Sequence, residues 1–146
     1  MAARLSIGSW GPAAWTIMHA TSFAYPVHPE AHDRERMYEF LVSLAAVLPC
    51  RKCRVDWQKY LQTHLISPDS PHLSGRGPIS RFLVAGHNHV NAKLGKRLVA
   101  YDTVAKWYLQ DDAGYGRLWG IAGFVLVVVL AASICVRHRL RHRTKS

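Results

Sequence analysis

A run of 19 residues without a charged side chain, from Leu118 to Val136, places the strongest constraint on what this chain can fold into. As a helix it is about 28 Å long, close to the roughly 30 Å hydrocarbon core of a bilayer. Tyr115 and Trp119 stand near one end, where interfacial aromatic residues are expected, and five basic residues follow the other end. The run predicts a single transmembrane helix, because a small domain rarely surrounds a helix that is apolar on every face.

The net charge of +10 over 146 residues is distributed unevenly along the chain. All nine acidic residues precede Leu118, whereas the last ten residues carry five basic side chains and no acidic one. Half of the net charge therefore belongs to a short tail, and the preceding part is only mildly basic. We expect no nucleic-acid partner, because binding through basic charge needs a continuous basic surface and the acidic residues are scattered through the domain.

The sequence allows two orientations of the predicted transmembrane helix in the membrane. The basic tail favours a cytosolic C-terminus by the positive-inside rule. Residues 1–15 lack the continuous apolar stretch of a signal peptide, which favours a tail anchor with the folded domain facing the cytosol. We favour the tail anchor and expect four segments: a folded domain over residues 1–110, a linker over 111–117, the transmembrane helix over 118–136 and a basic tail over 137–146.

The apolar residues before residue 110 recur with a helical period, and the sequence has no convincing alternating strand pattern. We therefore predict an all-α fold: a four-helix bundle plus a short fifth helix, followed by one C-terminal transmembrane helix. The expected boundaries are a first helix with Pro12 in its first turn and a break at 25–29, a second ended by Pro49, a third from Cys50 to about Leu65, a loop over 67–78, a fourth from near Ser80 to about Gly95, and a fifth capped by Asp102.

Cys50 and Cys53 form the sequence Pro-Cys-Arg-Lys-Cys at the start of a predicted helix. The helix dipole and the basic side chains of Arg51, Lys52 and Arg54 lower the expected pKa of a thiol at this place. Two cysteines at this spacing are close enough to form a disulfide, and a disulfide at a helix start is open to attack by another thiolate. The pair therefore indicates redox chemistry.

Two other interpretations of the cysteine pair remain open. Cys50 and Cys53 are half of a zinc site if His87 and His89 supply nitrogen ligands, although positions i and i+2 of a helix point to different sides. A zinc-stabilised, membrane-anchored interaction module is therefore the alternative function. Two structural cysteines in a reduced core are the other interpretation, which the flanking charges disfavour.

The fourth predicted helix carries an unusual polar run that begins at His87. Asn88 and Asn91 are poor helix formers, so a directed hydrogen-bonding role competes with the ordinary reading of a solvated face. Lys93 and Lys96 follow, and both suit a phosphate group. The run predicts a nucleotide-containing cofactor, for which stacking surfaces are available elsewhere in the sequence: Trp10, Trp15, His19, Tyr25 and Trp107.

In combination, these motifs resemble the Erv/Alr family of FAD-linked sulfhydryl oxidases. Their order and spacing fit across roughly residues 8 to 108. The matching pieces are Trp10-Gly11-Pro12 with Trp15 and His19, Tyr25-Pro26, Pro49-Cys50-Arg51-Lys52-Cys53-Arg54, and the run from His87 to Lys96.

The resemblance implies a helical bundle that holds FAD without a Rossmann fold, usually as a homodimer. It implies that Cys50 exchanges with an incoming dithiol protein or thioredoxin-like shuttle, that Cys53 is the flavin-proximal sulfur, and that electrons pass through FAD to O2 to give hydrogen peroxide. No resident metal is expected. The implied cofactor-binding residues are Trp10, Gly11, Pro12, Trp15, His19, Tyr25, Cys53, His87, Asn88, Val90, Asn91, Lys93, Leu94, Lys96, Trp107 and Tyr108.

The chain departs from the family pattern in two respects. Phe82 stands where the family usually has Trp, and no second cysteine pair accompanies Cys50 and Cys53. The second departure predicts direct oxidation of a partner, or a partner that is itself the shuttle. Such minimal forms resemble those encoded by large cytoplasmic DNA viruses, so we expect a single-pass protein of a host or virion membrane with its catalytic domain facing the cytosol.

Overall fold

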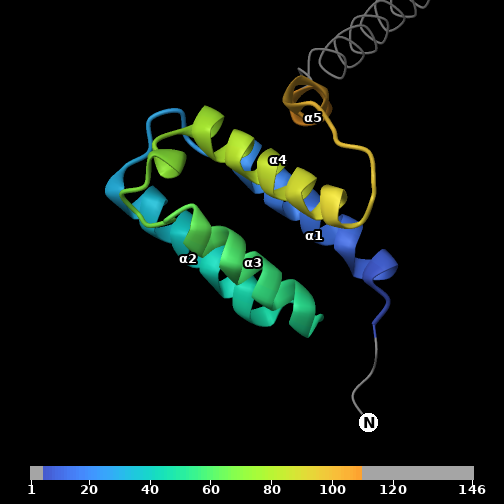
Figure 1. Cartoon of the computed structure of the whole chain (residues 1–146). Helices are drawn as coiled ribbons and strands as arrows, with labels where there is room; N and C mark the ends of the chain where they lie inside the picture. Colours follow the sequence, from blue (N-terminus) through green and yellow to red (C-terminus); the bar gives the residue numbers. More distant parts are fainter. Residues whose placement is uncertain (1–4, 110–146) are drawn as a thin grey trace, which may run out of the picture. The chain divides into compact units, whose positions relative to one another are not determined.

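The computed structural model describes residues 5–109, and this part of the chain is entirely helical apart from its connections (Figure 1). It confirms the predicted all-α fold with a short fifth helix. The elements are α1 (Ile7–Ala24), α2 (Ala31–Val47), α3 (Arg51–Thr63), the short 3-10 helix η1 (Pro71–Leu73), α4 (Arg76–Lys93) and α5 (Tyr101–Tyr108).

The predicted linker, transmembrane helix and basic tail lie outside the described residues. Across residues 5–109, none of the helices combines the length and the apolar character needed to cross a membrane.

Two prolines set the ends of the first two helices. Tyr25 precedes Pro26 and has the extended backbone angles φ −61° and ψ 145°, so α1 ends at Ala24. Leu48 precedes Pro49 in the same way, with ψ 135°, and α2 ends one residue earlier. A residue before proline is excluded from the helical region by the proline ring, and both of these ends are as the sequence predicts.

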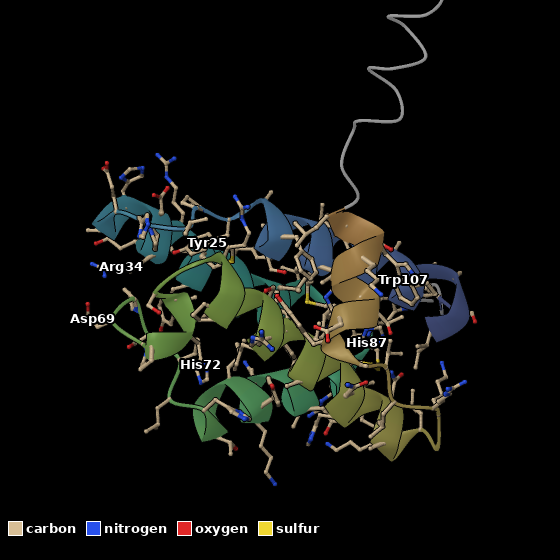
Figure 2. All side chains as sticks on the ribbon, turned by 90° about the horizontal axis from the view of Figure 1, so that it is seen from above. Tyr25, Arg34, Asp69, His72, His87 and Trp107 are labelled. Atoms are coloured by element: carbon tan, nitrogen blue, oxygen red, sulfur yellow. A yellow bond between two sulfur atoms is a disulfide. The ribbon has the colours of Figure 1, made fainter. Side chains whose placement is uncertain are left out.

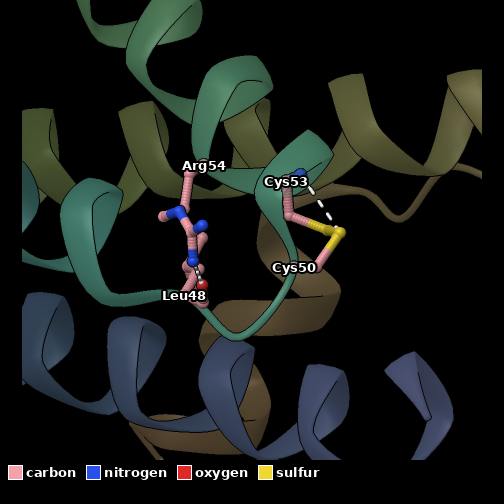
Figure 3. Close-up of a disulfide and its surroundings, with 4 residues drawn as sticks. All are labelled: Leu48, Cys50, Cys53 and Arg54. Carbon is pink, nitrogen blue, oxygen red and sulfur yellow. Dashed lines mark hydrogen bonds between the residues drawn. A yellow bond between two sulfur atoms is a disulfide. The ribbon is translucent and has the colours of Figure 1, made fainter. Parts of the chain in front are cut away.

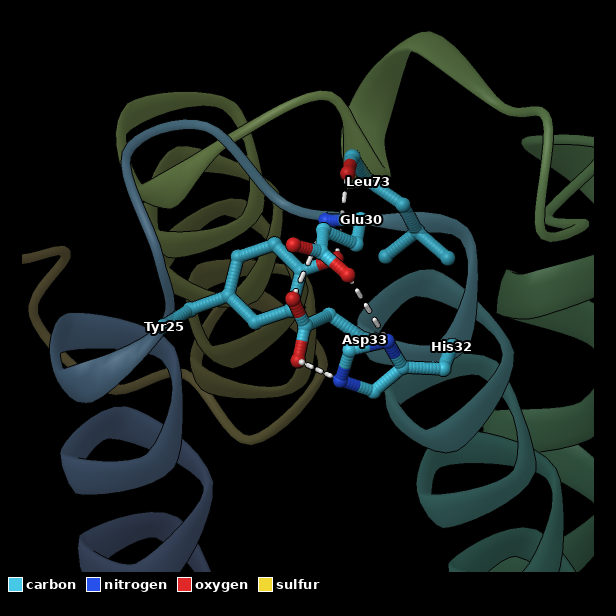
Figure 4. A network of polar contacts seen from close by, with 5 residues as sticks. All are labelled: Tyr25, Glu30, His32, Asp33 and Leu73. Atoms are coloured by element: carbon cyan, nitrogen blue, oxygen red, sulfur yellow. Dashed lines mark hydrogen bonds and ion pairs between the residues drawn. The ribbon is translucent and has the colours of Figure 1, made fainter.

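The start of α2 is held by a reciprocal set of side-chain hydrogen bonds (Figure 4). The side chain of Glu30 accepts from the third backbone N–H of the helix, and Asp33 accepts from the backbone N–H of Glu30 at 3.0 Å. The ring of His32 lies between the two carboxylates, 3.4 Å from Glu30 and 3.2 Å from Asp33. This capping box fixes where the chain turns from the first helix into the second.

The start of α1 differs from the prediction. The helix begins at Ile7, so Pro12 is its sixth residue rather than part of its first turn. A proline within a helix removes one backbone hydrogen bond, here the one that the carbonyl of Gly8 would accept. Gly8 is exposed, so water can satisfy that carbonyl and the helix continues through Pro12.

The starts of α4 and α5 also differ from the predicted ones. α4 begins at Arg76 rather than near Ser80, because Pro78 falls in the first turn, where a backbone N–H has no partner within the helix. The N-cap of α5 is Ala100, and Asp102 lies in the first turn instead of capping the helix. A carboxylate in that turn still interacts favourably with the helix dipole.

The helices pack in pairs, α1 against α4 and α2 against α3 (Figure 1). The centre of the bundle is filled by apolar side chains with no exposed surface, including Leu41, Leu73, Ile79 and Leu83. A second, smaller apolar cluster of Phe23, Val84 and Val104 fixes α5 against α1 and α4.

Two large aromatic side chains of α3 fill the space between α3 and α4. The rings of Trp57 and Tyr60 are stacked with centroids 5.3 Å apart, and each donates a hydrogen bond to a backbone carbonyl, Trp57 to Leu41 and Tyr60 to Phe82. Gly86 of α4 faces both rings, and a Cβ there would lie 3.0 Å from each of them. The two rings therefore leave no room for a side chain at position 86.

We predict that Gly86→Ala destabilises the domain by about 1–3 kcal/mol, because the added methyl group overpacks a site whose neighbours are held by hydrogen bonds. Gly77→Ala is the matched control, since no atom lies within 4 Å of a Cβ at that helical position and alanine is the better helix former. Denaturant unfolding of the purified chain measures both changes. Equal stability of the two variants would contradict this assignment of Gly86.

Candidate functional site

Cys50 and Cys53 form a disulfide at the junction of α2 and α3 (Figure 3). Cys50 is the N-cap of α3, and its sulfur accepts a hydrogen bond of 3.2 Å from the backbone N–H of Cys53. The positive end of the helix dipole and a backbone N–H thus both lie at the sulfur of Cys50. The sequence prediction of a disulfide at a helix start is confirmed.

A guanidinium group holds the connection that presents this disulfide (Figure 3). Arg54 donates a hydrogen bond of 2.6 Å to the carbonyl of Leu48, the C-cap residue of α2. The carbonyls at a helix C-terminus lack partners within the helix and carry partial negative charge. The half-buried Arg54 therefore ties the start of α3 to the end of α2, while Arg51 and Lys52 on the same helix are exposed.

A cavity of about 230 Å³ opens beside the disulfide, and we call it the disulfide cavity. Both cysteines line it, together with aromatic side chains from α1 and α3: Trp10, Trp15, Trp57 and Tyr60. An apolar, ring-lined space next to a reactive sulfur pair is suited to a flat aromatic ligand.

A second cavity of about 440 Å³ lies between α1, α4 and α5, and we call it the histidine cavity. Its polar side chains include His19, His87, Asn91 and Lys96. Trp15 lines both cavities, as do the backbone-exposing Gly11 and the apolar side chains of Ile7, Val90 and Leu94. The two cavities therefore share a wall, and their combined volume falls in the range of roughly 300–1,000 Å³ typical of small-molecule sites.

His19 and His87 are joined by a hydrogen bond of 3.0 Å between Nε2 of the first and Nδ1 of the second. The ring of His87 also stacks on Trp15 with centroids 4.2 Å apart. Burial, and then the proximity of His87, lower the pKa of His19 to about 4, while burial, and then Lys96, lower the pKa of His87. Both rings are therefore neutral at pH 7, which lets one nitrogen donate and the other accept.

Two buried side-chain nitrogens have no hydrogen-bond partner among the atoms of residues 5–109: Nε1 of Trp10 and Nδ1 of His19. Trp10 lines the disulfide cavity and His19 lines the histidine cavity. A buried polar atom without a partner is unfavourable by about 1–3 kcal/mol. Each cavity therefore offers a polar atom that a ligand can satisfy.

An ion pair closes one edge of the disulfide cavity. Lys93 of α4 lies 3.1 Å from a carboxylate oxygen of Asp56, one helical turn after Cys53 on α3. Both side chains line the cavity. The sequence indicated Lys93 but not Asp56, whose position follows from the three-residue spacing to Cys53.

The structure brings most of the predicted cofactor residues together around the two cavities. Figure 2 shows His87 and Trp107 at the α5 end of the domain, away from Tyr25 and His72. The predicted residues that line one or both cavities are Trp10, Gly11, Pro12, Trp15, His19, Cys53, His87, Val90, Asn91, Lys93, Leu94, Lys96, Trp107 and Tyr108.

Two predicted residues lie elsewhere. Tyr25 is buried at the far end of α1, where its hydroxyl donates to the carbonyl of Leu73 at 3.2 Å (Figure 4). The side-chain amide of Asn88 makes two hydrogen bonds to the backbone of Val99, of 2.8 and 2.9 Å. Asn88 does have the directed hydrogen-bonding role that its place in a helix indicates, but its partner is the connection between α4 and α5.

Other residues of the site were not indicated by the sequence patterns alone. Trp57 and Tyr60 line the disulfide cavity, and Trp57 follows Cys53 by four residues, the spacing that places two side chains on one helix face. Phe82 lines neither cavity and packs against Tyr60 and His72 in the core.

The zinc interpretation finds no support in the described part of the chain. Nowhere within residues 5–109 do three His, Cys, Asp or Glu side chains gather in a metal-binding arrangement. The two sulfurs are bonded to each other, His87 pairs with His19, and His89 lies against the ring of Tyr60.

Comparisons with known proteins identify a consistent set of relatives. The model of the Erv1 / Alr family matches residues 12–110. The chain is 34% identical over 97 residues to the probable FAD-linked sulfhydryl oxidase R368 of Acanthamoeba polyphaga mimivirus. It is 33% identical over 100 residues to the putative FAD-linked sulfhydryl oxidase 096R of invertebrate iridescent virus 3, and 30% identical over 86 residues to the mitochondrial FAD-linked sulfhydryl oxidase ERV1 of Saccharomyces cerevisiae.

These alignments cover 66%, 68% and 59% of the chain, and 66%, 65% and 43% of the respective relatives. The chain thus spans less than two-thirds of the length of each. The fold is similar to the crystal structure of the yeast Erv1 core, with a TM-score of 0.65 and 25% identity, over 74% of this chain and 87% of that one.

We predict that acid destabilises the domain through His19. Because the pKa of His19 is lowered to about 4 in the folded chain, the unfolded chain binds more protons between pH 6.5 and about 4, and stability falls as pH falls through this window. The contribution reaches about 3 kcal/mol. Between pH 6.5 and about 4, the free energy of unfolding should fall less steeply with falling pH in His19→Gln than in the wild type. The exposed His28→Gln is the control, and an unchanged slope in His19→Gln would refute the assignment.

We also predict that Arg54→Met lowers the free energy of unfolding by about 1.5–3 kcal/mol, because it removes a charge-assisted hydrogen bond and keeps most of the apolar stem. Arg51→Met, on the exposed face of the same helix turn, should stay within about 0.5 kcal/mol of the wild type. Denaturant unfolding of the oxidised chain compares the two. If both variants lost a similar free energy of unfolding, the hydrogen bond from Arg54 to Leu48 would make no specific contribution to stability.

Proposed function

The chain belongs to the Erv1 / Alr family, and from this we propose that it is an FAD-dependent sulfhydryl oxidase, a thiol oxidoreductase that forms disulfide bonds in partner proteins. The observation that carries the proposal is a disulfide at a helix N-terminus that opens onto an aromatic-lined cavity. A buried structural disulfide would have no need of such a cavity.

The residues around the two cavities fit FAD. The disulfide cavity supplies ring surfaces and the unpartnered Nε1 of Trp10, and the histidine cavity supplies the unpartnered Nδ1 of His19 and the ammonium group of Lys96. The remaining residues that would hold the cofactor are Gly11, Pro12, Trp15, His87, Val90, Asn91, Lys93, Leu94, Trp107 and Tyr108. Tyr25 and Asn88 are not included, because they line neither cavity.

When bound, FAD accepts an electron pair from the reduced cysteines and delivers it to O2, giving hydrogen peroxide. The chain's own residues prepare this chemistry by position. Cys53 packs against the main apolar core and lines the disulfide cavity, whereas Cys50 precedes the helix and is not part of that packing. We therefore assign Cys50 as the sulfur that substrates reach and Cys53 as the sulfur on the cofactor side.

The thiol–disulfide exchange is balanced as follows. A substrate thiolate attacks the sulfur of Cys50, and the disulfide breaks with Cys53 leaving as a thiolate. The second thiolate of the substrate then attacks the substrate sulfur of the mixed disulfide and expels Cys50. The substrate dithiol is oxidised to a disulfide and the cysteine pair is reduced by the same two electrons.

The helix N-terminus assists the second of these exchanges. The backbone N–H of Cys53 donates to the sulfur of Cys50, and the dipole of α3 favours negative charge at that place. A leaving thiolate of lower pKa departs faster, so this geometry promotes release of the oxidised substrate.

The setting of the enzyme is also part of the proposal. The charge-free run over 118–136 supports a single membrane anchor. We place the catalytic domain on the cytosolic side, the orientation of a tail-anchored protein. The family resemblance supports a homodimer, and we propose the groove between α1 and α2, lined by Ile17, Tyr25 and Phe40 among others, as its interface. The thiol partner is either a dithiol protein or a thioredoxin-like shuttle.

The test of the proposed function is oxygen uptake and peroxide formation by the purified chain with dithiothreitol. Cys50→Ser and Cys53→Ser should each lower the rate by about 100-fold or more, because either change removes the disulfide that receives the electrons. Cys135→Ser changes the third cysteine of the chain, which lies in the charge-free run, and as the control it should keep the wild-type rate. A colourless protein containing zinc, or a Cys53→Ser variant with full activity, would refute the proposal.

A further inference from the structure

Exposed side chains of two kinds flank Cys50 along the chain, at the end of α2 and the start of α3. Val47 ends α2 with 70% of its surface exposed, and Val55 on the outer face of α3 is 56% exposed. Between them lie the exposed residues Pro49, Arg51 and Lys52. We call these five residues the Cys50 rim.

The charge of the Cys50 rim is wholly positive. Between Glu39 and Asp56 the chain carries three basic residues and no acidic one. Arg54 is occupied by the carbonyl of Leu48, and Asp56 is paired with Lys93. Within the described range, neither Arg51 nor Lys52 has a carboxylate partner.

The cations near the disulfide and the two cavities are not all explained by a cofactor. Lys96 lines the histidine cavity, and Lys52 and Lys93 line the disulfide cavity, although Lys52 is also exposed to solvent. Arg51 lines neither cavity, and its side chain is exposed beside Cys50. An unpaired guanidinium on the side from which a substrate approaches is suited to binding a carboxylate through two parallel hydrogen bonds.

We propose that the Cys50 rim binds the segment of a partner protein in which the oxidisable cysteine is flanked by acidic side chains. This inference rests on the proposed function and names the substrate class of the same site. Carboxylates of the segment pair with Arg51 and Lys52, and its apolar side chains contact Val47 and Val55. The complementary charge raises the rate at which such segments are captured.

The same pairing promotes the chemistry of the incoming thiol. Neighbouring carboxylates raise the pKa of a cysteine and leave less of it as the reactive thiolate. When Arg51 and Lys52 neutralise those carboxylates, the thiolate is favoured again at the moment when it lies against Cys50. A substrate of this class is therefore slow to react with ordinary disulfides and is activated at the rim.

The test uses three dithiol peptides of equal length and cysteine spacing, whose cysteines are flanked by aspartate, serine or lysine. Dithiothreitol is the uncharged reference substrate. Oxygen uptake by the purified full-length chain gives kcat/KM for each. At low salt we expect the aspartate peptide to exceed the lysine peptide by about tenfold or more, with the preference shrinking as ionic strength rises.

Charge variants assign the preference to the rim. Arg51→Gln with Lys52→Gln should abolish the preference, and Arg51→Glu with Lys52→Glu should invert it. Because both residues also influence the thiol pKa of the cysteine pair, the preference is taken as the ratio of the two peptide kcat/KM values within each variant, where a change in the reactivity of the pair itself cancels. Lys59→Glu is the control for long-range charge, because Lys59 is exposed, lines neither cavity and lies about 12 Å beyond Arg51 along α3. This control variant should keep the wild-type ratio of kcat/KM between the aspartate peptide and the lysine peptide.

Two results would overturn the inference: equal kcat/KM for the three peptides in the wild type, or a preference that survives in both rim variants. In either case turnover of dithiothreitol shows that the oxidase function still holds. Absence of turnover with every dithiol, dithiothreitol included, contradicts the proposed function on which the inference rests.

Discussion

The position of the Cys50–Cys53 disulfide at the N-terminus of α3 is the constraint on which the rest of the site depends. Pro49 ends α2 and leaves Cys50 in an extended conformation, so that its sulfur caps the next helix. Arg54 then ties the new helix back to the carbonyl of Leu48. The sulfur pair is thereby held between a positive helix terminus and an aromatic cavity, with one cysteine packed on the core and the other at the rim. A short connection between two helices thus determines the geometry, the electrostatics and the direction of the exchange.

The neighbouring helices provide a site that is largely preformed. Trp57 and Tyr60 keep α3 and α4 apart by the thickness of their rings and form one wall of the disulfide cavity. Glycine at position 86 is needed because that wall leaves no room for a methyl group. On the other side of Trp15, burial keeps His19 and His87 neutral and able to share a hydrogen bond. In the proposed function, the chain places rings, neutral imidazoles and ammonium groups around FAD, and FAD would contribute the reaction with oxygen.

The parts of this arrangement that the sequence predicts are those set by local rules. Proline marks the ends of α1 and α2, helical periodicity marks the helices, and the Pro-Cys-Arg-Lys-Cys sequence marks the disulfide. The rest depends on contacts between distant segments. Nothing next to Asn88 in the sequence shows that it bonds to Val99, eleven residues later. Tyr25 directly follows the helix that carries Trp15 and lies about 15 Å from Trp15 along the helix axis, at the other end of the bundle. α1 continues through Pro12 because the carbonyl of Gly8 is exposed to water, and local sequence rules do not predict that exposure.

The central claim is that the Cys50–Cys53 pair passes electrons to a flavin held beside it. The most direct measurement is the visible flavin absorption of the purified chain during anaerobic addition of a dithiol. The account predicts that the wild-type protein carries flavin and that the band bleaches, whereas in Cys53→Ser the flavin is bound and the band persists. A purified protein without flavin, or equal bleaching in the wild type and in Cys53→Ser, would contradict it.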